Sequence, residues 1–316
     1  MSESDVSSKS VPRLLGCILV VWTWFLMALG ALTRAAQAGV SCPDWPLCHG
    51  QLIPPLDAAF YPADPRYAVC RVYFEFLHRV LAGVLAVGTA GLISIEWRRG
   101  MRWFAAALAT VLGLQIAMGA VTVWLRNAPF TVVVHLALAL SFLAVLITSL
   151  RAFGIQLSRE PPPRYLVRGY RALGVTVVLQ LLLGGVVSSR SIGLACADFP
   201  LCNGFPLPLY WTEPIAWQIA HRALGYVVFL GSVALFAAAR LGGAGARERT
   251  ISTCLFVGVS IQVLLGALNV WLRIPPVVSA AHLACAVLLF AVIVERVASV
   301  RSATQPSEST SFGAHL

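Results

Sequence analysis

Charged side chains are scarce in this sequence. Asp, Glu, Lys and Arg together make up 11% of its 316 residues, whereas 59% of the residues are hydrophobic. Soluble domains carry roughly one quarter charged residues, so the composition excludes an ordinary soluble protein. Most of the chain is therefore predicted to lie in a lipid bilayer.

Long apolar runs are present instead. A hydrocarbon core about 30 Å thick requires about 20 apolar residues per helix, and eight segments meet this requirement. Very short connections join the third to the fourth segment and the seventh to the eighth, which predicts antiparallel hairpins. The segments are residues 14–33, 72–95, 103–125, 129–150, 171–189, 215–239, 251–272 and 276–295.

The net charge of +10 would also fit a nucleic-acid partner, but the positions of the cations favour another explanation. Arginines gather in alternate connections, at residues 98–102, 151–171 and 240–249. By the positive-inside rule these connections and both termini are cytoplasmic. We therefore expect no nucleic-acid partner, and a bacterial plasma membrane as the location.

The first apolar segment has a second interpretation. Residues 35–38, Ala-Ala-Gln-Ala, resemble the cleavage site of a signal peptide. The apolar run is long for such a peptide, and it has a counterpart in the fifth segment. We therefore interpret it as a membrane helix that is retained.

The chain contains an internal repeat. Residues 39–50 match residues 193–204 without a gap at an offset of 154, and residues 115–137 match residues 262–284 at a constant offset of 147. Each repeat contains four predicted helices, so both have the same orientation. The sequence thus predicts an all-α polytopic membrane protein with two tandem four-helix bundles related by an internal pseudo-two-fold repeat. We expect bundles at 13–151 and 171–301, a cytoplasmic linker at 152–170, and disordered tails at 1–12 and 302–316.

Four of the six histidines lie in predicted membrane helices: His78, His135, His221 and His282. Each stands about six residues past the outer end of its helix, so at about 1.5 Å per residue all four are expected about 9 Å deep. Ionisable residues in membrane helices are costly and usually functional. Two histidines that face each other in a bundle can bind a haem iron axially, so we predict one haem in each half.

Simpler interpretations compete with haem. A membrane histidine can serve only as a hydrogen-bonding group between helices, although a matched pair in each half favours a metal. Zinc or copper would recruit carboxylates or thiols at the same depth. Arg79 and Arg222 each follow a histidine directly and are candidates to pair with haem propionates. The alternative is a guanidinium that extends to the membrane surface.

Two cysteine pairs occupy the predicted outer loops, Cys42 with Cys48 and Cys196 with Cys202. An oxidising compartment lets disulfides persist, so we predict one disulfide within each loop. Such short loops gain little stability from closure. Each disulfide therefore either holds a lid over a haem, exchanges redox equivalents, or only links the loop.

The halves differ beside the histidines. Glu75 stands three residues before His78 and so faces the same side of its helix, and it is the only carboxylate well inside a predicted membrane segment. Its counterpart before His221 is Gln218. The difference suggests chemistry in the first half, with Glu75 as a proton acceptor, and a fixed cofactor in the second. An acid that only hydrogen-bonds a neighbour is the alternative.

These residues resemble the haem A synthase family over about residues 14–299. The resemblance rests on residues 39–50, 75–79 and 115–126, on His135, and on their second-half counterparts. It implies an oxidoreductase of haem biosynthesis. The reaction would oxidise the C8 methyl group of haem O to the formyl group of haem A, by successive hydroxylations and loss of water.

The resemblance also implies roles for the site residues. His78 and His135 would flank the substrate, haem O, and His221 and His282 would be the axial ligands of a permanent haem b. Glu75 matches the acidic residue of the family's catalytic half. Cys42 and Cys48 match the family's first-loop cysteine pair, which is thought to take part in electron or proton transfer.

Other functions remain open at this point. A dihaem b-type electron-transfer protein would explain the histidines but not the difference between Glu75 and Gln218. A membrane thiol oxidase would use the outer-loop cysteines, and a transporter is disfavoured because no helix is visibly broken in both halves. Candidate partners besides the bilayer are haem O synthase, an electron acceptor and further copies of the chain.

Overall fold

The computed structural model describes residues 3–155 and 161–299. Within them the chain forms eight helices long and apolar enough to cross a membrane, which confirms the predicted all-α fold class. Two short 3₁₀ helices, η1 (Ala58–Phe60) and η2 (Pro65–Tyr67), lie in the loop between the first two long helices. The long helices are α1 (Glu3–Ala35), α2 (Val69–Arg98), α3 (Arg102–Trp124), α4 (Pro129–Ala152), α5 (Arg164–Ser189), α6 (Glu213–Leu241), α7 (Ala246–Trp271) and α8 (Pro276–Ala298).

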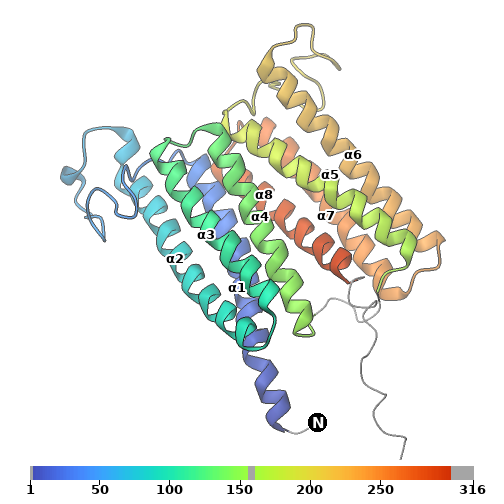
Figure 1. Cartoon of the computed structure of the whole chain (residues 1–316). Helices are drawn as coiled ribbons and strands as arrows, with labels where there is room; N and C mark the ends of the chain where they lie inside the picture. The colour runs from blue at the N-terminus through green and yellow to red at the C-terminus, as the bar shows by residue number, and fades with distance from the viewer. Residues whose placement is uncertain (1–2, 156–160, 300–316) are drawn as a thin grey trace, which may run out of the picture.

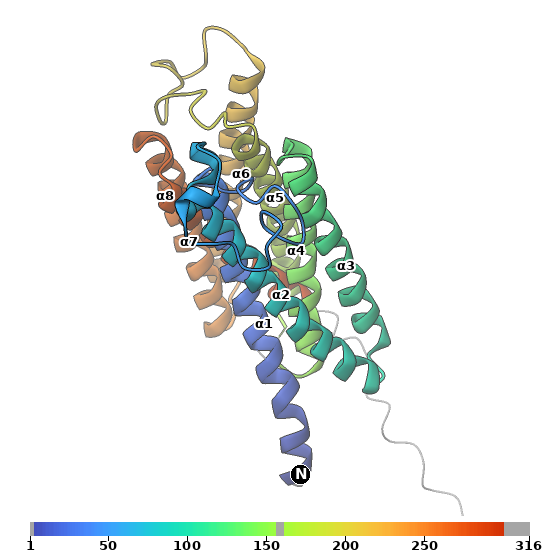
Figure 2. The ribbon, with the colours of Figure 1, turned by 90° about the vertical axis from the view of Figure 1, so that its left-hand side faces the viewer.

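The helices form two groups of four that repeat the same arrangement. In Figure 1, α1 to α4 lie on the left and α5 to α8 on the right, and Figure 2 shows them from the side. Within the first group α1 contacts α2 and α4, and within the second α5 contacts α6 and α8. The groups meet where α1 packs against α8, and where α4 packs against α5 and α8. The contacts of α1 with α8 and of α5 with α4 are equivalent in the repeat.

Several helices are longer than the apolar runs. Helix α1 begins at Glu3, inside the expected tail, and α5 begins at Arg164, inside the expected linker 152–170. Extending an existing helix gains one hydrogen bond for each residue fixed, so polar residues can join its ends. The expected tail 302–316 lies outside the described residues.

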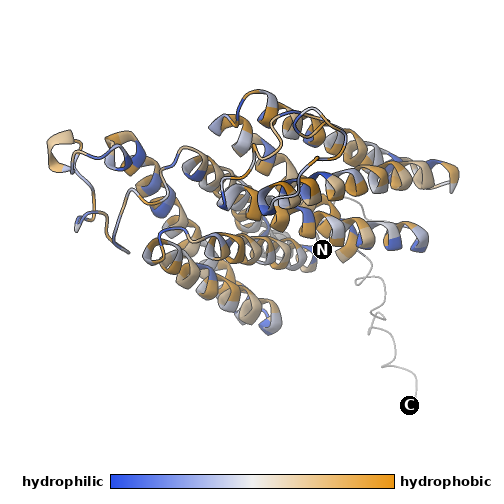
Figure 3. Cartoon of the chain, turned by 90° about the horizontal axis from the view of Figure 1, so that it is seen from above, coloured by the Kyte–Doolittle hydropathy of each residue, from blue (hydrophilic) through white to orange (hydrophobic). Residues whose placement is uncertain are grey.

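Apolar side chains cover much of the outside of the bundle. Large exposed hydrophobic residues occur along the helices, for example Val87, Val175 and Leu230, and Figure 3 shows the hydropathy from above. In water such a surface would be an aggregation hazard. The pattern fits helices whose outward faces contact lipid.

Polar contacts join the halves at both ends of the bundle. At the end that bears the disulfide loops, Arg34 of α1 donates to the carbonyl of Ser188 on α5. At the opposite end Arg151 of α4 pairs with Glu295 of α8. Next to that pair, Arg296 binds Glu248 at 2.7 Å. The groups of these two pairs are buried, so breaking one partner would leave an uncompensated charge.

Candidate functional site

Each half carries a loop closed by a disulfide, between its first and second long helices. Cys42 is bonded to Cys48, and Cys196 to Cys202, as predicted. All four cysteines are buried although they lie in loops. Both disulfides therefore belong to packed loops and not to mobile tips.

An aspartate shapes each loop. The carboxylate of Asp44 accepts hydrogen bonds from the backbone N–H groups of His49 at 2.6 Å and Gly50 at 2.7 Å. Both residues have positive φ, at 54° and 72°, a conformation that glycine adopts readily. Asp198 binds its loop in the same way, at 2.6 and 2.7 Å. The repeated Cys-x-Asp-x-Pro-x-Cys-x-Gly pattern thus builds the same turn twice.

The position after the second cysteine supports the same turn with different side chains. The His49 ring Nε2 lies 2.8 Å from the carbonyl oxygen of Ser41. Asn203, its counterpart, donates from Nδ2 to the carbonyl of Ala195 at 3.2 Å. Ser41 and Ala195 are equivalent in the repeat, so His49 has a structural contact here that the sequence did not reveal.

Arg79 and Arg222 hold these loops to the helices. The Nη1 of Arg79 donates to the carbonyls of Asp44 and Leu47, both at 2.6 Å, and Nη2 donates to that of Cys42 at 3.0 Å. Arg222 makes the three equivalent contacts, with the carbonyls of Asp198, Leu201 and Cys196. The guanidinium groups therefore point at the loops, an arrangement that neither propionate pairing nor extension to the surface had suggested.

Glu75 joins the first loop to the helix that carries His78. Its Oε2 accepts hydrogen bonds from the backbone N–H groups of Ser41 at 2.7 Å and Cys42 at 2.9 Å. Its Oε1 accepts one from Arg79 at 2.7 Å. The side chain is buried, with 6% of its surface exposed. One carboxylate thus contacts the disulfide loop on one side and the histidine helix on the other.

Gln218 occupies the equivalent place, but it donates a hydrogen bond to its loop where Glu75 accepts hydrogen bonds. Its Nε2 donates to the carbonyl of Gly193 at 3.0 Å, and its Oε1 is buried without a hydrogen-bond partner among the described residues. An amide cannot accept a proton as a carboxylate can. The second half therefore keeps the link to its loop but lacks an acid–base group at this point.

The four histidines form one pair in each half. His78 on α2 lies near His135 on α4, and His221 on α6 lies near His282 on α8. The expected six-residue spacing from the outer helix end holds for α4 and α8. It is wrong for α2 and α6, because these helices begin before their apolar runs.

A glycine of the neighbouring helix packs against each histidine. A Cβ atom added at Gly30 of α1 would lie 3.0 Å from the His78 Cε1, and one added at Gly184 of α5 would lie 3.0 Å from the His221 Cε1. A Cβ atom added at Gly119 would lie 3.5 Å from the His135 Cε1, and one added at Gly266 would lie 3.2 Å from the His282 Cε1. The contacts recur at the repeat offsets, so a small residue beside each imidazole is part of both sites. Gly30 and Gly184 were not found from the sequence.

The donor set suits a haem. The Nδ1 atom of every one of these histidines is buried without a hydrogen-bond partner among the described residues, yet each residue keeps some accessible surface. Buried imidazole nitrogens that lack partners are costly, and iron ligation is one way to use a histidine in such a place. Among residues 3–155 and 161–299 no three His, Cys, Asp or Glu side chains gather as a metal site would need. Paired histidines alone fit axial ligation better than zinc binding.

Gln115 is a further residue at the first pair. Its Nε2 lies 3.2 Å from the Nε2 of His135. An iron bound at this nitrogen would have to displace the amide. The sequence identified Gln115 only as part of the repeat.

Comparisons with known proteins agree with this site. The family model of the cytochrome oxidase assembly proteins (COX15-CtaA) matches residues 13–294. The chain is 27% identical to the haem A synthase of Rhizorhabdus wittichii, over 87% of this chain and 90% of that one. For the haem A synthase of Shewanella oneidensis the identity is 26%, over 88% and 93%. For that of Geobacillus thermodenitrificans it is 28%, over 85% of each chain.

The matched region contains all eight membrane helices almost to their ends, and these relatives come from bacteria. The protein is thus a multi-pass bacterial membrane protein. With this coverage and the two equivalent histidine pairs, the chain belongs to the haem A synthase family.

Proposed function

We propose that this protein oxidises the C8 methyl group of haem O to a formyl group, and so produces haem A. The first half holds the substrate between His78 and His135. The second half holds a permanent haem b between His221 and His282. The observation that carries this proposal is that two equivalent histidine pairs differ in one adjacent group, Glu75 against Gln218.

The two histidines of the first half position the substrate. Paired imidazoles that hold the iron fix the macrocycle, so that one edge stays at a constant place relative to the protein. Such positioning contributes several kcal/mol to catalysis. The iron supplies the oxidising chemistry when haem is bound. Gly30 and Gly119 keep the neighbouring helices close to the imidazoles.

Glu75 takes up a proton at a carboxyl oxygen. Converting a methyl to a formyl group is a four-electron oxidation, in which two hydrogens are lost and one oxygen is gained. The electrons pass to the electron acceptor, and a base near the substrate takes up a released proton. Each carboxyl oxygen of Glu75 already accepts a hydrogen bond and has capacity for more. Its contacts with the backbone N–H groups of Ser41 and Cys42 hold the carboxylate against the disulfide loop. Arg79 and Arg222 keep the loops over the two sites.

The topology proposed has both termini in the cytoplasm and the disulfide loops on the outer side. This orientation places most loop arginines inside and the disulfides in an oxidising compartment. Haem O synthase, as the source of substrate, and an electron acceptor are the partners that the reaction requires. A homo-oligomer is a further candidate.

Haem analysis tests the function. The gene is expressed with haem O synthase in a bacterium that lacks its own haem A synthase, and the extracted haems are separated by chromatography and identified by mass. We expect haem A to appear and haem O to fall. Haem O that stays unconverted, with haem b bound at both histidine pairs of the purified protein, would support a dihaem electron-transfer protein instead.

A further inference from the structure

Helix α1 belongs to the first half but contacts ligand-bearing helices of both halves. The indole N–H of Trp24 donates to the carbonyl of Ala284 on α8 at 2.8 Å. Ala284 stands two residues after His282. Two residues earlier on α1, Trp22 donates to the carbonyl of Leu81 on α2 at 3.1 Å, three residues after His78. Two tryptophans of one helix thus bind a histidine helix in each half.

The repeat shows which residues occupy the equivalent of the Trp24 contact. The offset of 154 relates Trp24 to Val178 on α5, and the offset of 147 relates Ala284 to Ala137 on α4. The glycine–histidine contacts recur at the same offsets, so the two alignments hold in three dimensions. The interface of α4 with α5 is therefore the counterpart of the interface of α1 with α8.

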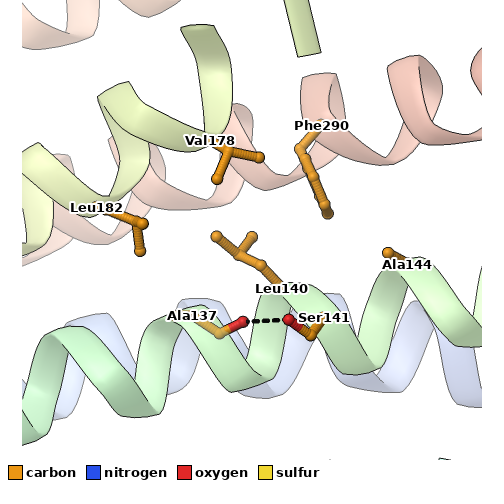
Figure 4. Close-up of a pocket in the computed structure, with 7 residues that line it drawn as sticks. All are labelled: Ala137, Leu140, Ser141, Ala144, Val178, Leu182 and Phe290. Carbon is orange, nitrogen blue, oxygen red and sulfur yellow. Dashed lines mark hydrogen bonds between the residues drawn. The ribbon is translucent and has the colours of Figure 1, made fainter. Parts of the chain in front are cut away.

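A cavity lies at this counterpart. The cavity is a recess that opens to the outside of the bundle at the exposed Ser141. Figure 4 shows Val178 and Ala137 on opposite sides of it, and its volume is about 200 Å³. The carbonyl of Ala137 accepts a hydrogen bond from the hydroxyl of Ser141 at 2.8 Å. No indole among the described residues donates to it. The other lining residues come from α4, α5 and α8, and are Leu140, Ala144, Leu182 and Phe290.

An indole and a cavity constrain a helix differently. A large aromatic side chain between two helices, with its N–H bonded to a backbone carbonyl, fixes the height and rotation of the second helix. Atoms that line a cavity lack partners on one side, so the helices beside it can shift with less loss of contact. Helix α8 carries His282 and borders the cavity through Phe290, but the Trp24 indole holds it. Helix α4 carries His135 and lines the cavity with Ala137, Leu140 and Ala144, and among the described residues no indole donates to it there.

We propose that Trp24 is a positioning residue that fixes α8 and His282, whereas the cavity between Val178 and Ala137 lets α4 and His135 shift when substrate enters and product leaves. This inference rests on the proposed function, in which the second half keeps its haem and the first half exchanges its own. A cofactor site gains from a fixed ligand helix. An exchange site gains from one movable ligand helix, here α4, opposite a ligand helix that Trp22 holds in place, α2.

Substitutions at Trp24 test the fixed side in the full-length purified protein. Trp24→Phe keeps most of the aromatic bulk and removes the N–H, and Trp24→Val copies the second-half residue. We expect the electron paramagnetic resonance signal of the second-half haem to shift, and the rate of haem b loss to apomyoglobin to rise about fivefold for Trp24→Phe, as loss of one hydrogen bond of about 1 kcal/mol implies. Trp24→Val should have the larger effect. Trp22→Phe is the matched control, since it leaves the α8 contact intact and should leave the haem b signal unchanged.

Val178→Trp tests the movable side. The new indole fills the cavity, so we expect transfer of bound haem O to apomyoglobin to slow severalfold, with the haem b signal unchanged. A thermal unfolding midpoint at or above that of the unmodified protein shows that the indole fits. Leu182→Trp places an indole at another point of the cavity wall. It replaces Val178→Trp if that variant folds poorly, and it checks that the slower transfer comes from filling the cavity and not from the change at residue 178 itself.

The outcomes separate this inference from the proposed function. Unmodified protein that binds no haem b would reject the cofactor assignment. Unmodified protein that binds haem b, with the same signal and loss rate after Trp24→Phe and Trp24→Val, would reject Trp24 as a positioning residue. An unchanged haem O transfer rate in the folded cavity variants, or a lipid acyl chain found tightly bound in the cavity by native mass spectrometry, would reject the movable side.

Discussion

The two halves share a scaffold and differ at few points near the histidines. In both loops an aspartate binds two backbone N–H groups and an arginine binds three carbonyls. Glu75 and His49 in the first half are replaced by Gln218 and Asn203 in the second. The replacements keep a contact with the loop, but Gln218 donates to the carbonyl of Gly193 where Glu75 accepts from the N–H groups of Ser41 and Cys42. The comparison teaches that the two halves support the same loop with different chemistry, a carboxylate and an imidazole at these positions in the first half and two amides in the second.

Removing histidines should give the largest difference between the halves. We expect His221→Ala and His282→Ala each to abolish the low-spin haem b spectrum of the purified protein, because one axial ligand cannot hold the site in the same state. His78→Ala and His135→Ala should keep that spectrum and abolish haem A formation. Absorbance and electron paramagnetic resonance spectra measure the first effect, and extracted haems the second. Retention of a normal signal in the His221/His282 double variant would contradict the ligand assignment.

Exchanging Glu75 and Gln218 tests the acid–base difference. Loss of a general base typically costs 10²–10⁴-fold, so we expect Glu75→Gln to lower the rate of haem A formation by about 100-fold or more. The haem b spectrum should not change. Gln218→Glu is the matched control, and should leave the rate within about twofold, because its site makes no product. A Glu75→Gln enzyme with normal turnover would show that Glu75 serves only to hold the loop.

Removing each disulfide should separate stability from function. Each closes a loop with a sequence separation of 6, and closure of so short a loop contributes about 2 kcal/mol. We therefore expect the Cys42→Ser/Cys48→Ser and Cys196→Ser/Cys202→Ser variants to lose similar thermal stability, measured by unfolding in detergent. Only the first pair should also lower turnover beyond the fraction unfolded. Equal losses of turnover would assign both disulfides a purely structural role.

Alanine in place of the glycines beside the histidines should give the smallest effects. Their size should follow how closely the added Cβ approaches the imidazole. Gly30→Ala and Gly184→Ala place a Cβ at 3.0 Å from an imidazole carbon, and overpacking of this kind costs about 1–3 kcal/mol. Gly30→Ala should weaken haem O binding, and Gly184→Ala should shift the haem b spectrum. Gly119→Ala, with ordinary contact at 3.5 Å, should be nearly neutral. The same response at all three positions would show that these contacts do not shape the sites.

Much of the fold could be predicted because membrane helices and repeats have strong local signals. Apolar runs gave all eight helices, and the aligned motifs gave the histidine pairs and both disulfides. Helix ends were less accurate, as at Glu3 and Val69, because a helix can continue beyond the apolar run that hydropathy detects. Lipid solvent explains why the apolar pattern dominates.

Contacts between distant residues could not be predicted. Glu75 binds backbone N–H groups 33 and 34 residues away, and Trp24 binds a carbonyl 260 residues away. Such pairs depend on how helices pack, which hydropathy does not encode. Gly30 likewise resembles other helical glycines in sequence, and only its distance from His78 distinguishes it.

The contact of Arg34 with Ser188 bears on how the two bundles are joined. The two residues occupy the same position in the two repeats, 154 residues apart. In a symmetric dimer, a residue near the axis meets its own copy in the other subunit. The joint between the two bundles therefore has the geometry of a two-fold subunit interface, built within a single chain.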